Sequence, residues 1–144
     1  DVERSRGLGD VYKRQVGFGL SYILPVITAL LIGSTQQDTT VIIENPEAHL
    51  HPKGQTELAR LVCLASMCGC QVIIETHSDH FFDGIRIFTK KHPYFSKEIL
   101  VNWFEQDLKG NSHVENPRIL PSGRLDKWPE GLFDQFEINA EELL

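Results

Sequence analysis

Apolar residues recur at two different spacings along the chain, and the spacing separates expected strands from expected helices. Two short runs rich in β-branched residues, 39–44 and 71–75, predict strands that are buried on both faces. Residues 53–68 and 79–91 repeat apolar side chains every three or four positions, which predicts amphipathic helices. The other expected elements are a helix at about 20–33, a strand at 99–104 and a weaker strand around 113–120.

The order of these elements predicts an α/β fold with a mainly parallel sheet flanked by helices. Strands that are joined through helices by short connections form right-handed crossovers, which leave the strands parallel. In such a sheet, ligands collect at the carboxyl ends of the strands. The polar segment ENPEAHLHP (44–52) follows the first strand, and ETHSDH (75–80) follows the second, with Ser78 or Asp79 as the expected cap of the next helix. We therefore expect both polar segments at the same edge.

The first 35 residues fall into two parts. Residues 1–15 lack clean periodicity and look like translated sequencing-adapter sequence, so we expect them to be a non-native leader. Residues 16–35 carry no charge, so a membrane span or a signal peptide is an alternative to a buried helix. The glycines, serine and proline of this segment favour the buried helix, preceded by a glycine loop at 17–21, with Pro25 near the first turn.

Composition and charge restrict the possible partners. The chain has 144 residues, of which 41% are hydrophobic and 24% charged, as in an ordinary globular domain or part of a larger one. Its net charge of −6 is concentrated in residues 126–144, where six acids accompany one base. This argues against strong duplex binding through general electrostatics, so a nucleic-acid partner has little support. Reduced thiols and a cytoplasmic location are expected from three closely spaced cysteines, Cys63, Cys68 and Cys70.

Glu44 and His77 carry the most specific chemistry in the two polar segments. Glu44 follows three apolar strand residues, and burying a carboxylate there is unfavourable unless it is paired or bound to a metal. Mg²⁺ with phosphate oxygens meets this need in α/β nucleotide sites, and hydrogen bonds from backbone amides meet it equally well. His77 follows the neighbouring strand, where an imidazole can donate to a phosphate oxygen or orient water, although a lone His is more often structural.

Both polar segments also resemble those of a known family. IIENPEAHLHP resembles the Walker B and D-loop segment of ABC-type P-loop ATPases of the OLD/RecF/SMC-like branch, and IIETHSDH resembles their switch-histidine segment. VGFGLSYILPVITALL is placed like their signature loop and helix, and the 33 positions from Glu44 to His77 match the family's separation. WPEGLFDQ looks like the C-terminal region of predicted AAA-type ATPases with a C-terminal domain of unknown function.

This resemblance covers residues 16–138 and implies a domain organisation. Residues 16–106 would form the C-terminal half of an ATPase domain, and residues 107–144 a small β-containing extension. No GxxxxGK[ST] occurs in the sequence, so the phosphate-cradling loop is expected upstream. The chain alone is then expected to be inactive. The intact protein is expected to bind ATP, hydrolyse it with Mg²⁺ as a nucleotide-gated homodimer, and switch an attached or partner effector.

The resemblance also implies roles for particular residues. Glu44 would hold Mg²⁺ directly or through water, and His77 would sense the γ-phosphate of ATP. Asn45 occupies the position of the family's catalytic Glu, and an amide can orient water but cannot accept its proton. Glu47 is the candidate substitute for that base. The residues implied to contact the nucleotide of a partner subunit, or to lie near the dimer seam, are Gly17, Gly19, Ser21 and His51.

A metal-dependent hydrolase is one alternative function. His49 and His51 form an HxH pair after a strand, similar to the metal ligands of amidohydrolase barrels. A zinc site would be completed by Glu44, His77 and His80. The length of the chain disfavours this alternative, because an eight-stranded α/β barrel usually needs about 250 residues and this chain has 144.

A non-catalytic interaction module is the second alternative. Its docking surface would be the acidic C-terminal segment with residues 128–133, although the Trp and Phe of this segment are also expected to cover the sheet. Nucleic acid is the possible partner of a basic stretch formed by Arg86, Lys90, Lys91 and His92. Four basic side chains on one helix more often form a solvated face than a binding site for nucleic acid.

Overall fold

The computed structural model describes residues 18–36, 38–107 and 109–144. The expected leader, residues 1–15, and Gly17 lie outside this range. The described part divides between Phe81 and Phe82 into two compact units, each with its own small sheet. The α/β fold is confirmed, because one sheet is parallel and flanked by helices and the other is antiparallel.

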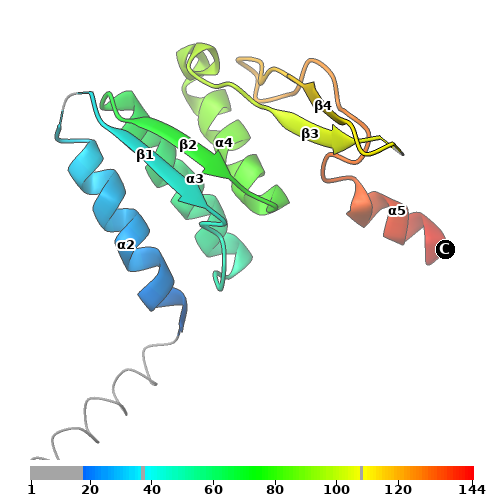
Figure 1. Ribbon diagram of the computed structural model, residues 1–144, viewed down its shortest axis with the longest axis horizontal. Helices are drawn as coiled ribbons and strands as arrows, with labels where there is room; N and C mark the ends of the chain where they lie inside the picture. Colours follow the sequence, from blue (N-terminus) through cyan, green and yellow to red (C-terminus); the bar gives the residue numbers. More distant parts are fainter. Residues whose placement is uncertain (1–17, 37, 108) are drawn as a thin grey trace, which may run out of the picture. The chain divides into compact units, whose positions relative to one another are not determined.

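The first unit is built on a two-stranded parallel sheet (Figure 1). Strands β1 (Thr40–Glu44) and β2 (Gln71–Glu75) are connected by helix α3 (Pro52–Met67). Helix α2 (Phe18–Gly33) precedes β1 and contacts both β1 and α3, while α3 also contacts β2. This strand–helix–strand arrangement agrees with the sequence to within one residue at each end of β1, β2 and α3.

The two faces of the parallel sheet differ in how far they are covered. Val41 packs towards α2, because a Cβ added at Gly33 would lie 3.1 Å from its Cγ2, and the next inward residue, Ile43, is buried. On the other face Ile42 is 71% exposed, and its partner in register, Ile73, is 51% exposed. The expectation of strands buried on both faces is therefore wrong for the described residues. The helices that contact these strands cover only one of the two faces.

Helix α2 begins earlier than the sequence suggests. The expected glycine loop at 17–21 is already helical from Phe18, so Gly19 and Ser21 belong to the helix. Pro25 lies in the helix interior rather than in its first turn, where its missing N–H leaves the carbonyl group of Ser21 without a helical partner. None of the helices in the described part of the chain is both long and apolar enough to cross a membrane.

Helix α3 has clear start and stop signals and a buried apolar face. Pro52 opens it, and its N-cap residue, His51, accepts a hydrogen bond from the Lys53 N–H through Nδ1 at 3.4 Å. Gly69 follows the helix with a φ of +95°, as in a helix C-terminus. Cys63 is buried on the inner face, and this burial raises the pKa of its thiol to about 12. The three cysteines are free, which agrees with the expected reduced thiols.

The second unit contains the antiparallel sheet. Strands β3 (Trp103–Gln106) and β4 (Ser112–Glu115) pair antiparallel with each other, so the expected third strand at 99–104 does not join the parallel sheet. The turn between β3 and β4 favours their pairing, because the Asp107 carboxylate accepts hydrogen bonds from the N–H groups of Lys109 and Asn111. The other elements are α4 (Asp79–Lys91, which begins in the first unit), the 3₁₀ helix η1 (Pro93–Lys97) and α5 (Gln135–Glu142).

A segment after β4 packs on α4 within the second unit. Arg86 donates from Nε to the Gly123 carbonyl at 3.0 Å, and its guanidinium group lies 5.0 Å from the centre of the Trp128 ring. The rings of Phe82 and Phe133 lie 5.5 Å apart. The aromatic residues expected to cover the sheet therefore cover α4. Arg86 is held by these contacts and is not part of a freely solvated basic face.

Candidate functional site

The carboxyl ends of β1 and β2 form one rim, as the sequence predicts. Glu44 and Glu75 are Cα partners at the last position of the ladder, and both side chains are exposed. The Asn45 N–H continues the ladder by donating to the Glu75 carbonyl at 3.0 Å. We call residues 45–51 the first rim loop and residues 76–78 the second rim loop. Two like charges side by side disfavour each other, so a cation at this rim would be stabilising.

The first rim loop has an unusual backbone at two positions. Asn45 has a φ of +46° and His49 a φ of +63°. Asn tolerates the left-handed region better than most residues, because its short side chain can hydrogen-bond locally. The His49 ring lies 4.6 Å from the Tyr22 ring of α2. A Cβ at Gly19 would lie 2.8 Å from the His49 carbonyl oxygen, so glycine allows α2 to approach the loop closely.

Glu47 joins the two rim loops. Its Oε1 accepts a hydrogen bond from the backbone N–H of His77 at 2.9 Å. Its Oε2 is buried and has no hydrogen-bond partner among the described residues. A buried carboxylate oxygen without a partner is unfavourable, so it is suited to accept a hydrogen bond from a bound molecule.

The His77 imidazole is exposed and directed to a neighbouring acid. Its side chain is 82% exposed, and its Nε2 lies 2.8 Å from Oε1 of Glu75. The backbone of His77 is thus fixed by Glu47, while its ring remains open to solvent. An exposed pair of this kind is weak, so the ring can exchange Glu75 for another partner without a large loss of free energy.

The structure does not gather all expected site residues at this rim. His51 caps α3, and Ser21 is an exposed residue of α2. In the described part of the chain, neither side chain hydrogen-bonds to Glu44, Glu47 or His77. Gly17 is outside the described residues.

Three residues at the rim were not identified from the sequence as part of the site. Glu75 ends the second apolar run just as Glu44 ends the first, and this equivalence was the available signal. Ser78, predicted only as a possible helix cap, is 7% exposed and does cap α4 by accepting from the Phe81 N–H at 2.9 Å. Ser78 also donates to Oε1 of Gln55 at 2.6 Å. Nothing in the sequence distinguishes Gln55 from other polar helix residues.

The donor groups at the rim fit magnesium better than zinc. Within the ranges that the structure describes, no three His, Cys, Asp or Glu side chains are grouped so that they could hold a metal ion. The HxH pair is divided, because His49 packs on Tyr22 and His51 caps α3. Mg²⁺ needs only one or two carboxylates, since water and phosphate oxygens complete its shell. The exposed Glu44 meets this requirement.

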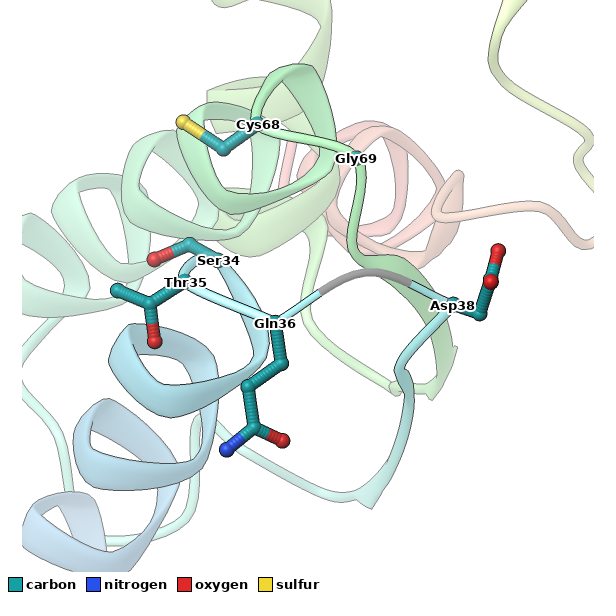
Figure 2. Close-up of a pocket in the computed structure, with 6 residues that line it drawn as sticks. All are labelled: Ser34, Thr35, Gln36, Asp38, Cys68 and Gly69. Carbon is teal, nitrogen blue, oxygen red and sulfur yellow. The ribbon is translucent and has the colours of Figure 1, made fainter.

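A polar hollow lies at the opposite ends of the strands. It is lined by the turns that follow α2 and α3, with the residues Ser34, Thr35, Gln36, Asp38, Cys68 and Gly69 (Figure 2). These turns lead into the amino ends of β1 and β2, whereas ligands of parallel sheets bind at the carboxyl ends. None of the expected site residues lines this hollow.

Comparison with known proteins identifies relatives of both parts of the chain. Residues 4–83, which include both rim loops, match the family described as "AAA domain, putative AbiEii toxin, Type IV TA system". Residues 96–143 match a family described as a protein of unknown function, DUF3696. The OLD nuclease of Thermus scotoductus (strain ATCC 700910 / SA-01) is 36% identical over 94 residues, which are 60% of this chain and 17% of that protein. The chain therefore spans less than a fifth of the length of this curated relative. The expected resemblance to the OLD/ABC-like branch is confirmed.

Proposed function

The chain belongs to the family of AAA domains described as putative AbiEii toxins of type IV toxin–antitoxin systems, and we propose that it supplies part of the ATP site of a larger Mg²⁺-dependent ATPase. The observation that supports this most is the in-register parallel pairing of β1 and β2, which brings both rim loops to one edge. The hydrogen bond from the His77 N–H to Glu47 then joins the two loops.

Glu44 and His77 have separate roles in this proposal. Glu44 holds Mg²⁺, directly or through water, and its exposure at the end of β1 leaves room for the water and phosphate oxygens of the shell. The bound Mg²⁺ supplies positive charge next to the phosphates. His77 donates to the γ-phosphate, and its exposed ring leaves Glu75 to make this contact.

Asn45 and Glu47 act on the attacking water. The Asn45 amide orients the water, and Glu47 takes its proton through Oε2, the oxygen that has no partner among the described residues. The oxygen of the water forms a bond to the γ-phosphorus, and the bond to the leaving ADP oxygen breaks. Glu47 keeps its position during this step because Oε1 remains bonded to the His77 N–H.

Glu47→Gln tests this role and should lower kcat for ATP by roughly 100-fold or more, which is the usual contribution of a general base. The Gln oxygen can still accept the His77 N–H, so only the charge and the basicity are lost. The measurement is ATP turnover by the intact gene product, with its melting temperature as a check on folding.

The matched control for this variant is Glu57→Gln. Glu57 is an exposed acid of α3 that is paired with Arg60 at 3.0 Å, and its replacement should leave kcat nearly unchanged. Equal kcat values for the Glu47 and Glu57 variants would exclude Glu47 as the base.

The proposed assembly rests on the resemblance to ABC-type ATPases. Gly17, Gly19 and Ser21 contact the ATP that is bound by a second copy, His51 lies near the seam of the homodimer, and the ATPase switches an attached or partner effector. Ser21 is exposed, as such a contact requires. We place the protein in the cytoplasm, in agreement with its three free thiols.

Removal of Mg²⁺ tests the function as a whole. The intact gene product should hydrolyse ATP with Mg²⁺, lose this activity in excess EDTA and regain it when Mg²⁺ is added back. Phosphate release is the measurement. A protein that regains activity with Zn²⁺ but not with Mg²⁺ would instead support the metal-dependent hydrolase. No ATP turnover in the presence of Mg²⁺ would overturn the proposal.

A further inference from the structure

Gln55 connects the two rim loops through both ends of its side-chain amide. Its Nε2 donates to the carbonyl oxygen of Leu50 at 2.9 Å, and its Oε1 accepts from the Ser78 hydroxyl at 2.6 Å. Leu50 belongs to the first rim loop and Ser78 to the second. Because the amide donates at one end and accepts at the other, its orientation between the loops is fixed.

Ser78 extends this connection into α4. Its Oγ accepts from the Phe81 N–H at 2.9 Å while donating to Gln55, so both functions of the hydroxyl are used. Ser78 is only 7% exposed and Phe81 is fully buried. Loss of the Gln55 contact would therefore leave a buried hydroxyl without its acceptor, which is unfavourable.

We propose that Gln55 is a positioning residue for His77, an inference that rests on the proposed function. His77 precedes Ser78 directly, and its own N–H is bonded to Glu47 of the first rim loop. The Gln55–Ser78 bond and the Glu47–His77 bond thus fix consecutive residues of the second rim loop to the first. Gln55 keeps the proposed γ-phosphate donor in register with Glu44, Asn45 and Glu47, without touching the nucleotide itself.

Gln55→Glu is the sharpest variant, because it changes the chemistry of one end of the side chain and almost none of its shape. A carboxylate still accepts from Ser78 but faces the Leu50 carbonyl with an oxygen that cannot donate. The matched control is Gln71→Glu. Gln71 is an exposed residue at the other end of β2, and its Oε1 accepts from the Thr40 hydroxyl at 2.9 Å.

The first measurement is steady-state ATP hydrolysis by the intact gene product. Gln55→Glu should lower kcat roughly tenfold or more, since small displacements of a group that acts on the reacting atoms have effects of this size, while KM for ATP changes much less. Ser78→Ala should have a similar effect, and Ser78→Thr, which keeps the hydroxyl, should retain most of the activity. The Gln71 variant should behave as wild type.

A double variant separates positioning from a general loss of stability. If Gln55 and Ser78 act through one connection, Gln55→Glu combined with Ser78→Ala should be hardly slower than the slower single variant. Multiplied effects on kcat, or a Gln55→Glu enzyme that matches Gln71→Glu, would overturn the inference.

Amide hydrogen exchange gives a second measurement that does not need ATP hydrolysis. Gln55→Glu should accelerate exchange at residues 77–81 relative to wild type and to Gln71→Glu. A wild-type protein without ATP turnover overturns the proposed function, and the exchange rates then decide on the connection between the loops. A wild-type protein that hydrolyses ATP, with unchanged exchange and unchanged kcat in Gln55→Glu, overturns the role of Gln55 alone.

Discussion

Glu44→Gln in the intact gene product should lower Mg²⁺-dependent ATP turnover by at least about 100-fold, because a bound metal contributes several kcal/mol of charge stabilisation. A neutral amide binds Mg²⁺ much more weakly than a carboxylate does. The fold should be unaffected, since the Glu44 side chain is exposed at the end of β1. The measurements are kcat as a function of Mg²⁺ concentration and the melting temperature.

The Mg²⁺ concentration that gives half-maximal activity shows whether the lower turnover comes from weaker metal binding. If Glu44 holds the metal, more Mg²⁺ should be needed for half-maximal activity, and Glu57→Gln should leave this concentration unchanged. Turnover within about twofold of wild type would mean that Glu44 is not a metal ligand, since a lost ligand has a far larger effect.

His77→Ala should lower kcat by roughly 10- to 150-fold, because a hydrogen bond to a charged group is worth about 1.5–3 kcal/mol. The exposed imidazole contributes little to folding, and the bond to Glu47 is made by the backbone of residue 77, so the rim loops should stay connected. Single-turnover hydrolysis by the intact gene product measures the effect on the chemical step.

His80→Ala is the matched control for this variant. The His80 side chain is about half exposed and follows His77 by three residues in the sequence, but the proposed ATP site does not use it. Its replacement should leave turnover nearly unchanged. An equal loss of ATP turnover in the His77 and His80 variants would point to a histidine-rich metal site. Unchanged turnover in both variants would show that His77 does not contact the γ-phosphate.

The elements from β1 to α4 could be predicted well because their apolar spacing is local. The strand 71–75 and the helix 79–91 were predicted with the observed bounds, and β1 begins one residue later than expected. The third strand could not be placed in the correct sheet, because it pairs with β4 across a turn in which the Asp107 carboxylate accepts backbone hydrogen bonds. Pairing partners are a property of the turn as well as of the strand.

The burial of the strands was harder to predict. A continuous apolar run indicates cover on both faces, yet Ile42 and Ile73 are exposed in the described part of the chain. Apolar side chains on a strand face indicate that the face favours contact with other apolar residues. They do not identify the segment of the protein that makes this contact.

The rim itself could be predicted, but its internal connections could not. Parallel pairing is sufficient to bring Glu44 and the second rim loop to one edge. The bonds of Glu47 to the His77 N–H and of Gln55 to Ser78 depend on how the first rim loop bends, including the positive φ values of Asn45 and His49. Sequence spacing carries no direct signal for such bends at residues other than glycine.

The positive φ of Asn45 limits which residues this position can hold. Left-handed backbone at most non-glycine residues is unfavourable by roughly 1–2 kcal/mol, and Asn and Asp are the residues that tolerate it best. Replacement of Asn45 by glutamate, the residue that the resemblance to ABC-type ATPases implies for this position, would therefore strain the loop that carries Glu47. Aspartate would restore an acid with less strain but with a shorter reach. Position 45 is therefore restricted by its backbone before the chemistry of its side chain is considered.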